Sequence, residues 1–336
     1  MFENKTILIT GGTGSLGQAL TKKLLNFPVK VIRLLSRNES FQVDMQRKFS
    51  DNKKLSFFIG DIRDYPRLTR ALEDVDIVFH TAALKHVPVI EYNPFEAVKT
   101  NIIGTQNIID ACLEQDVETV VGIGTDKAVS PLNTYGASKL LMEKLFVTAG
   151  NFVNPQRHRT KFITLRYGNV FGSSGSVVPL WINQIQQNEK ITITDNDMTR
   201  FSIMMDEALE FILSTAKIGK GSEIFVPKLR AYTITDLKNA LTELIGNSGE
   251  EITGIRSGEK LHEILINHDE MKYTWEYDGN YVIFNPLQSE SDILKKYPGI
   301  KKVENISEYS SNIAEKIPIS ELTQLISSSG LIPKNS

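Results

Sequence analysis

Five residues in one short segment carry side chains that can move a proton or hold a hydroxyl group: Thr125, Asp126, Lys127, Tyr135 and Lys139. Tyr135 and Lys139 are four positions apart, so a helix would place both on one face. A lysine ammonium beside a phenol lowers a pKa that is otherwise about 10, which makes tyrosinate accessible near neutral pH. Such a base can take a hydroxyl proton while the carbon beneath it gives up hydride. The spacing alone also occurs by chance on many surface helices.

The adjacent Asp126 and Lys127 supply a second acid/base pair at the end of an apolar run, as an elimination of water requires. Lys127 can act as a base only when it is neutral. Its pKa must therefore fall from about 10.4, and we expect burial and the positive neighbour Lys139 to lower it. The alternative interpretation is that Asp126 and Lys127 cap the strand and face water.

The elements that position these residues follow a regular alternation. Short apolar runs alternate with amphipathic helical windows, which predicts βαβ units and a doubly wound parallel sheet with helices on both faces. The apolar runs lie at 6–10, 30–36, 55–60, 76–82, 118–124 and 161–168.

The alternation of apolar runs and helical windows ends near Gly168, and we predict a smaller C-terminal α/β domain that binds the substrate. The dinucleotide-binding domain is expected at 1–167, with 203–227 returning to the main sheet. The substrate domain is expected at 168–202 and 228–336. The aromatic segment YTWEYDGNYVIFNP near the C-terminal third either caps the site or forms an interface.

Three glycines, Gly11, Gly14 and Gly17, lie between the first predicted strand and its helix. Glycines there allow a tight turn and close approach of backbone amides to a pyrophosphate, which the helix N-terminus also attracts. The motif predicts a dinucleotide site. Its full set of expected contacts is Gly11, Thr13, Gly14, Ser15, Leu16 and Gly17.

The residues after the second strand are Ser36 and Arg37, where a site for NAD would usually have an acid. A hydroxyl and a guanidinium suit a 2′-phosphate, so the sequence predicts NADP as the cofactor. The alternative is that Arg37 is a solvated residue at a strand end. Two further strand ends are expected to approach the adenine and the middle of the cofactor, with the residues Asp61, Ile62, Ala82, Ala83 and Lys85.

The combination of glycine motif, five βα units and Tyr-x-x-x-Lys resembles the extended short-chain dehydrogenase/reductase family. Within it, the segment TDK at 125–127 is similar to the inverting UDP-N-acetylglucosamine 4,6-dehydratases, as are AALKHVPVIEYNP, RYGNVFGSSGSVVP, DMTRF and RSGEKLHE. Ordinary sugar 4,6-dehydratases of the family have glutamate where this chain has Lys127. A 4-epimerase and a non-catalytic NADP-binding regulator remain the alternatives.

The resemblance implies a reaction on UDP-N-acetylglucosamine with NADP⁺ recycled in each turnover. Tyr135 would deprotonate the hydroxyl on carbon 4 while Thr125 holds it, and Lys139 would share the cofactor contact with Tyr135. Lys127 would remove the hydrogen on carbon 5, Asp126 would protonate the departing hydroxyl on carbon 6, and the division of these two roles stays open. The residues implied to bind the nucleotide sugar are Lys85, Asn169, Val177, Val178, Thr194, Arg200, Arg256 and Glu259.

The composition of the 336-residue chain excludes other classes. A net charge of −2 predicts no nucleic-acid partner, and no apolar run is long enough to predict a membrane span. The single Cys112 predicts a reducing, cytoplasmic environment. The five histidines lack metal-ligand spacing, so no metal is expected. Family resemblance implies a homo-oligomer, a dimer or hexamer, and leaves open pseudaminic acid, protein glycosylation, capsule or O-antigen L-sugars as the downstream product.

Overall fold

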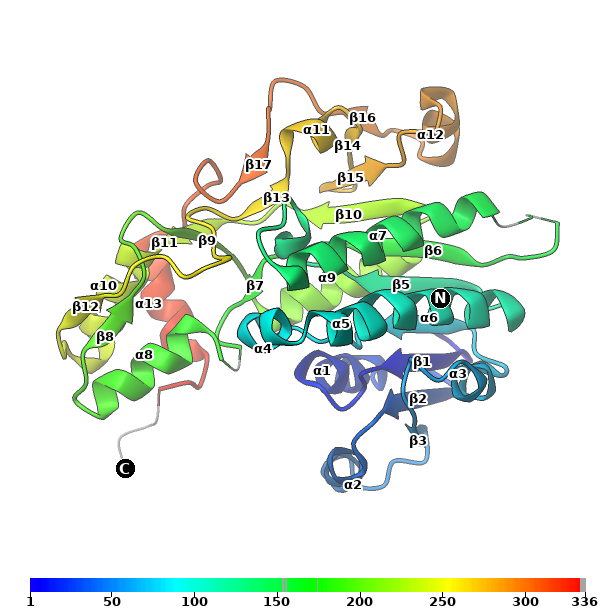
Figure 1. Ribbon diagram of the computed structural model, residues 1–336, viewed down its shortest axis with the longest axis horizontal. Helices are drawn as coiled ribbons and strands as arrows, with labels where there is room; N and C mark the ends of the chain where they lie inside the picture. Colours follow the sequence, from blue (N-terminus) through cyan, green and yellow to red (C-terminus); the bar gives the residue numbers. More distant parts are fainter. Residues whose placement is uncertain (153, 155, 174, 333–336) are drawn as a thin grey trace. The chain divides into compact units, whose positions relative to one another are not determined.

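A computed structural model describes residues 1–152, 154, 156–173 and 175–332 (Figure 1). The chain divides into two compact units. The first unit comprises Met1–Arg166, Leu209–Pro227 and Lys272–Glu304, and the second comprises Tyr167–Ala208, Lys228–Met271 and Asn305–Ser336.

A 10-stranded sheet forms the centre of the first unit, in the order β16-β14-β15-β10-β6-β5-β4-β1-β2-β3. The strands from β10 to β3 are all parallel, which confirms the doubly wound α/β fold. The order reverses between β1 and β4, and such a switch point leaves a crevice at the carboxyl ends of the strands. The parallel strands are β1 (Thr6–Thr10), β2 (Val31–Ser36), β3 (Leu55–Ile59), β4 (Ile77–His80), β5 (Thr119–Ile123), β6 (Lys161–Leu165) and β10 (Glu223–Pro227).

Helices cover both faces of this sheet, which explains why β1, β4 and β5 are buried along their whole length. On one face, Leu68, Ile108 and Phe146 pack with Val78 and Val120 in one hydrophobic core. That face is covered by α3 (Tyr65–Leu72), α6 (Gly104–Glu114) and α7 (Thr134–Phe152).

The other helices of the first unit have local starting signals where the chain supplies them. Asn38 caps the following helix by accepting a hydrogen bond from the Phe41 amide, as side chains of this type do at helix N-termini. The elements are α1 (Ser15–Leu24), α2 (Glu39–Lys48), α4 (Val87–Tyr92), α5 (Pro94–Ala97), the π-helix η1 (Val98–Ile103), the 3₁₀-helix η2 (Asp126–Ala128), α12 (Glu290–Lys296) and, from Leu209 onward, α9 (Met205–Ile218).

The aromatic segment near the C-terminus forms a β-hairpin that extends the main sheet. β15 (Asn280–Phe284) pairs antiparallel with β10, and β14 (Thr274–Tyr277) and β16 (Lys301–Lys302) follow outward. The turn contains Asp278 at φ 50° and Gly279 at φ 74°, the left-handed conformations that a two-residue hairpin turn requires. The prediction that 228–336 lies entirely in the second domain is therefore wrong for Lys272–Glu304, because this hairpin hydrogen-bonds to β10.

The second unit has its own core and small sheets. Trp181, Leu237 and Leu322 are buried together there. Its strands are β7 (Asn169–Val170), β8 (Ile191–Ile193), β9 (Thr199–Ile203), β11 (Ala231–Thr233), β12 (Glu250–Ile252), β13 (Ile264–Ile266) and β17 (Tyr309–Ser310), and its helices are α8 (Val177–Gln186), α10 (Ile234–Ile245), α11 (His268–Met271) and α13 (Ile319–Ser328). Within the described parts of both units, no helix combines the length and apolar character needed to cross a membrane.

Candidate functional site

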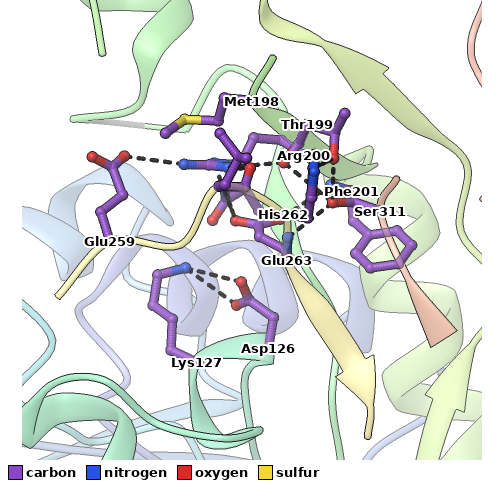
Figure 2. Close-up of polar contacts among 12 residues, drawn as sticks. Asp126, Lys127, Met198, Thr199, Arg200, Phe201, Glu259, His262, Glu263 and Ser311 are labelled. Carbon is purple, nitrogen blue, oxygen red and sulfur yellow. Dashed lines mark hydrogen bonds and ion pairs between the residues drawn. The ribbon is translucent and has the colours of Figure 1, made fainter. Parts of the chain in front are cut away.

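The predicted acid/base pair follows β5 in the first unit and begins the helix η2. Lys127 Nζ donates to both carboxylate oxygens of Asp126 at 3.2 Å, as Figure 2 shows. Thr125 Oγ1 also donates to Asp126 Oδ1, at 2.8 Å. The Asp126 side chain is only 4% exposed, whereas 35% of the Lys127 side chain is exposed. The alternative in which both residues face water is therefore wrong for Asp126.

Tyr135 lies in the first turn of α7, and its hydroxyl is hydrogen-bonded with Thr125 of this loop. Burial raises the pKa of the Tyr135 hydroxyl, while the positive charge of Lys127 and a hydrogen bond with Thr125 act to lower it. The negative charge of Asp126 acts in the opposite direction to Lys127. Charged and polar groups of the loop after β5 thus influence the pKa of the phenol at the start of α7.

Lys139 lies one helical turn after Tyr135 and is buried. Its Nζ donates to the Ile123 carbonyl at 2.6 Å, and burial lowers its pKa to about 8. The sequence predicted that Lys139 lowers the pKa of Tyr135. In the structure the cation that does so is Lys127, because the Lys139 amine is directed at the end of β5.

The glycine motif has the backbone geometry expected of a phosphate-binding turn. Gly11 has φ 68°, and a Cβ there would lie 3.0 Å from the backbone of Ala82. A Cβ on Gly17 would lie 2.5 Å from the Gly12 carbonyl oxygen, so α1 packs directly on the turn. Gly14 is the N-cap of α1 and has no side chain to cap it, which leaves the helix N-terminus suited to an anion. Thr13, Ser15 and Leu16 belong to the same turn and helix start.

The residues predicted around the adenosine lie at the ends of β2 and β3. The Ser36 hydroxyl accepts a hydrogen bond from Gln42 at 2.9 Å. Arg37 is 55% exposed, and its Nη1 lies 3.8 Å from Asp61 Oδ2. Burial acts to raise the pKa of Asp61, but hydrogen bonds from Arg63 lower it overall, so the carboxylate is ionised between two arginines.

The other predicted cofactor residues differ in how exposed their side chains are to a ligand. Ile62 is buried in the core of the first unit, so only its backbone is left for an adenine. The Ala82 amide donates to Thr10 Oγ1 at 3.3 Å, which places this segment beside Gly11. Ala83 is half-buried and Lys85 is exposed in the loop that follows β4.

Asn101 is a residue that sequence reasoning missed. It lies in η1, is buried, and hydrogen-bonds the Leu84 carbonyl at 2.9 Å, the Leu84 amide at 2.8 Å and Ser138 Oγ at 2.9 Å. It therefore ties the loop after β4 to the helix that carries Tyr135 and Lys139. Its sequence context is an ordinary helical window, so no local signal marked it.

In the second unit, Arg200 is a buried guanidinium between two carboxylates. Nη2 donates to Glu259 Oε1 at 3.0 Å, and Nε lies 3.5 Å from Glu263 Oε1 (Figure 2). Nη1 donates to the Thr199 and Leu261 carbonyls. The structure thus brings the predicted Arg200 and Glu259 together as a pair.

Glu263 is a second residue that sequence reasoning missed, although it is the last residue of the segment RSGEKLHE. It is buried and accepts hydrogen bonds from Asn169 Nδ2 at 3.0 Å and from the Phe201 amide at 3.1 Å. Asn169 and Arg200 are therefore held by one carboxylate. The parallel pairing of β7 with β9 brings their two segments side by side.

The remaining predicted residues of the second unit lie in different environments. Val178 is 1% exposed in the core, so its side chain does not line a binding surface, whereas Val177 is half-buried. Thr194 Oγ1 contacts Met198 Sδ at 3.4 Å. Arg256 is exposed. Among the residues that the structure describes, no cluster of His, Cys, Asp and Glu could hold a metal ion.

A parallel sheet with a glycine turn after β1 and a Tyr-Lys pair on the helix after β5 defines a Rossmann-fold protein of the short-chain dehydrogenase/reductase type. The family model for polysaccharide biosynthesis proteins matches residues 7–285, and the chain belongs to this family.

Two curated relatives and one crystal structure are similar over nearly the whole chain. The UDP-N-acetylglucosamine 4,6-dehydratase (inverting) of Campylobacter jejuni is 46% identical over 93% of this chain and 88% of its own length. A protein of Rickettsia felis named UDP-glucose 4-epimerase is 40% identical over 97% of this chain and 96% of its own length. The X-ray structure of Pen from Bacillus thuringiensis has a TM-score of 0.90 and 39% identity, covering 99% of this chain and 100% of that one.

Proposed function

We propose that the protein is an NADP-dependent UDP-N-acetylglucosamine 4,6-dehydratase that inverts carbon 5. The observation that carries the proposal is the hydrogen-bonded pair of Asp126 and Lys127, which acts electrostatically on Tyr135. A tyrosine base alone serves alcohol oxidation, whereas elimination of water needs a second acid and base. The 46% identical relative from Campylobacter jejuni carries the same activity in its name.

The residues present fit a nicotinamide dinucleotide. A side chain at Gly11 would crowd the backbone of Ala82, so the turn favours glycine at this position. The N-terminus of α1 has no side-chain cap. The exposed Arg37 guanidinium at the end of β2 suits a 2′-phosphate, which supports NADP over NAD. When bound, the cofactor would accept a hydride from sugar carbon 4 and return it to carbon 6.

The proton transfers are assigned to this chain's own side chains. Tyr135 takes the proton of the hydroxyl on carbon 4, and Thr125 orients that hydroxyl. The resulting ketone acidifies the hydrogen on carbon 5, which Lys127 removes as a neutral amine. Asp126, as a neutral acid, protonates the hydroxyl leaving carbon 6, so one water departs.

The reaction closes with inversion at carbon 5. A proton returns to that carbon from the face opposite to the one that lost it, and carbon 6 becomes a methyl group. The product is UDP-2-acetamido-2,6-dideoxy-β-L-arabino-hexos-4-ulose. No net oxidant is consumed, because carbon 4 is oxidised while carbon 6 is reduced.

We assign nucleotide binding to the second unit. The exposed Arg256 and the buried Arg200 offer guanidinium groups to the diphosphate, and Glu259 and Asn169 lie in the same hydrogen-bonded cluster as Arg200. The half-buried Val177 and Thr194, with the backbone of Val178, are assigned to the uracil. Lys85 is assigned to both ligands. A homo-oligomer, a cytoplasmic location and a role in pseudaminic acid or related L-sugar synthesis stay predictions.

A 4-epimerase is the second candidate, because relatives with that name are 40% identical over almost the full chain. Incubation with UDP-N-acetylglucosamine and NADP⁺ in heavy water separates the two. We expect a product that has lost one water and carries solvent deuterium at carbon 5. An epimer of unchanged mass without deuterium contradicts the dehydratase, and tightly bound cofactor without sugar conversion indicates a regulator.

A further inference from the structure

A buried ion pair between Glu143 on α7 and Arg166 after β6 has no part in the steps above. Both side chains are 0% exposed. Arg166 Nη2 donates to Glu143 Oε2 at 2.7 Å, and Nε donates to both carboxylate oxygens at 3.0 Å. Burying two charges carries a large desolvation cost, so a hydrophobic pair of similar volume would often be as stable. Stability alone therefore does not account for the pair.

The pair borders the reactive residues on the same helix face. Tyr135, Lys139 and Glu143 follow one another at intervals of four residues on α7, so the carboxylate lies one turn beyond the lysine. Glu143 is the negative charge that favours the protonated form of Lys139, against the burial that disfavours it. Lys139 in turn holds the Ile123 carbonyl at 2.6 Å.

The pair also borders the start of the loop that carries the acid and base. A Cβ on Gly124 would lie 2.6 Å from Glu143 Oε1 and 2.4 Å from the Leu165 carbonyl oxygen. The Gly124 amide donates to that same carbonyl at 2.7 Å. Gly124 directly precedes Thr125, so the Glu143 carboxylate packs against the residue that joins β5 to the Thr125–Lys127 loop.

The geometry points to Glu143 and Arg166 as positioning residues of the reaction: their ion pair holds the charged end of Lys139 and the start of the Thr125–Lys127 loop in place. Arg166 donates to the Glu143 carboxylate through Nε and Nη2, and this carboxylate packs against Gly124 one helical turn beyond Lys139. The inference rests on the proposed function, since that function gives Tyr135 and Lys139 their part in the reaction.

Two titratable groups interact electrostatically with Lys139: Glu143 on its own helix and His80 at the end of β4. Arg166, directly after β6, is paired with Glu143. Asp126 and Lys127 act on Tyr135 from η2. His80 is neutral near physiological pH because burial lowers its pKa to about 3. Glu143 is therefore the group whose removal should change the protonation of Lys139.

The test follows Lys139 directly, without turnover. The protein is labelled with ¹³C at lysine Cε, and the Lys139 signal is assigned by its loss in Lys139→Met. We expect the wild-type signal to titrate near pH 8. In Glu143→Gln the midpoint should fall by about one unit or more, because an opposite charge at this range shifts a pKa by that amount. Glu143→Asp should recover most of the shift.

A second variant separates positioning from folding. Glu143→Gln leaves Arg166 buried without its partner, so we expect a lower melting temperature, and Glu143→Gln with Arg166→Gln should recover part of it by removing both charges. The pH midpoint of the Lys139 titration should stay below the wild-type value in this double variant. A wild-type midpoint in both variants overturns the inference, whatever their stability.

Activity then distinguishes the two proposals. The alkaline limb of the pH profile for kcat/KM should move to lower pH in Glu143→Gln together with the lysine midpoint. Failure of the wild-type protein to release water from the sugar, with the lysine shift intact, overturns the proposed function but supports the positioning role. An unshifted lysine in an active dehydratase overturns only the positioning role.

Discussion

Lys127 Nζ lies 3.2 Å from each carboxylate oxygen of Asp126. Moving one proton along either contact produces a neutral amine and a protonated acid together, the two forms that the proposed elimination uses. In water this transfer opposes a pKa difference of about 6.5 units, from about 10.4 to about 3.9. Only 4% of the Asp126 side chain is exposed, so water has little access to the carboxylate end of this contact.

Removing either member of this pair should stop the reaction after oxidation. We expect Lys127→Met and Asp126→Asn to lower the rate of water release about 10²- to 10⁴-fold, the range for general acid or base groups. Reduced nicotinamide should still form, because the Tyr135 hydroxyl is retained, but more slowly in Lys127→Met, which loses the positive charge that lowers the pKa of Tyr135. Product release by mass spectrometry and absorbance of the reduced cofactor measure the two steps.

Tyr135→Phe is the matched control, since it should abolish both steps. Dehydration at the wild-type rate in Lys127→Met would contradict the assignment of the acid/base pair.

Arg37→Ala should weaken NADP⁺ binding while affecting NAD⁺ little. A hydrogen bond to a charged group contributes about 1.5 to 3 kcal/mol, so we expect Kd for NADP⁺ to rise roughly 10- to 150-fold. Titration calorimetry with both cofactors measures the difference. Arg47→Ala, an exposed arginine on α2, serves as the control. An equal loss for the two cofactors would show that Arg37 does not contact the 2′-phosphate.

The two arginines assigned to the diphosphate should behave differently. Arg256 is exposed, so Arg256→Ala should raise KM for the UDP-sugar about 10-fold or more with an unchanged melting temperature. Arg200→Ala should also destabilise the fold by roughly 3 to 5 kcal/mol, because it removes the guanidinium that lies 3.5 Å from the buried Glu263 carboxylate. Steady-state kinetics and urea unfolding separate the effects. Unchanged stability in Arg200→Ala would argue against a structural part for this ion pair.

His80 should make the fold sensitive to mild acid. It is buried between the hydroxyl groups of Thr10, at 2.8 Å from Nδ1, and Thr105, at 3.2 Å from Nε2, and burial lowers its pKa to about 3. The unfolded chain binds a proton below about pH 6.5, whereas the folded chain does not, so stability falls as pH drops from about 6.5 toward 3. At pH 5 the loss is about 2 kcal/mol.

Urea unfolding at pH 7.5 and pH 5 tests the role of His80. His80→Gln should lose about 2 kcal/mol less than the wild type between these two pH values. His268→Gln, at an exposed position in α11, should lose as much as the wild type. Equal pH dependence in all three proteins would show that another group is responsible.

The sequence alone was sufficient for the parallel part of the fold and for the shared helix face of Tyr135 and Lys139. Apolar runs bounded by glycine turns predict buried parallel strands, because a strand covered on both faces has no polar side. The Tyr135 and Lys139 spacing predicts a shared helix face, since the helical period is local. The glycines after β1 likewise predict the turn, because its backbone conformation depends on the residues that form it.

Tertiary structure alone decided the contacts between distant segments. Lys272–Glu304 joins the main sheet because β15 hydrogen-bonds to β10, a pairing that no local pattern specifies. Glu143 meets Arg166 and Glu263 meets Asn169 only when separate strands and helices come together. For the same reason the positive charge that lowers the pKa of Tyr135 comes from Lys127 rather than Lys139: electrostatic influence depends on distance and burial in the folded chain, and sequence spacing specifies neither.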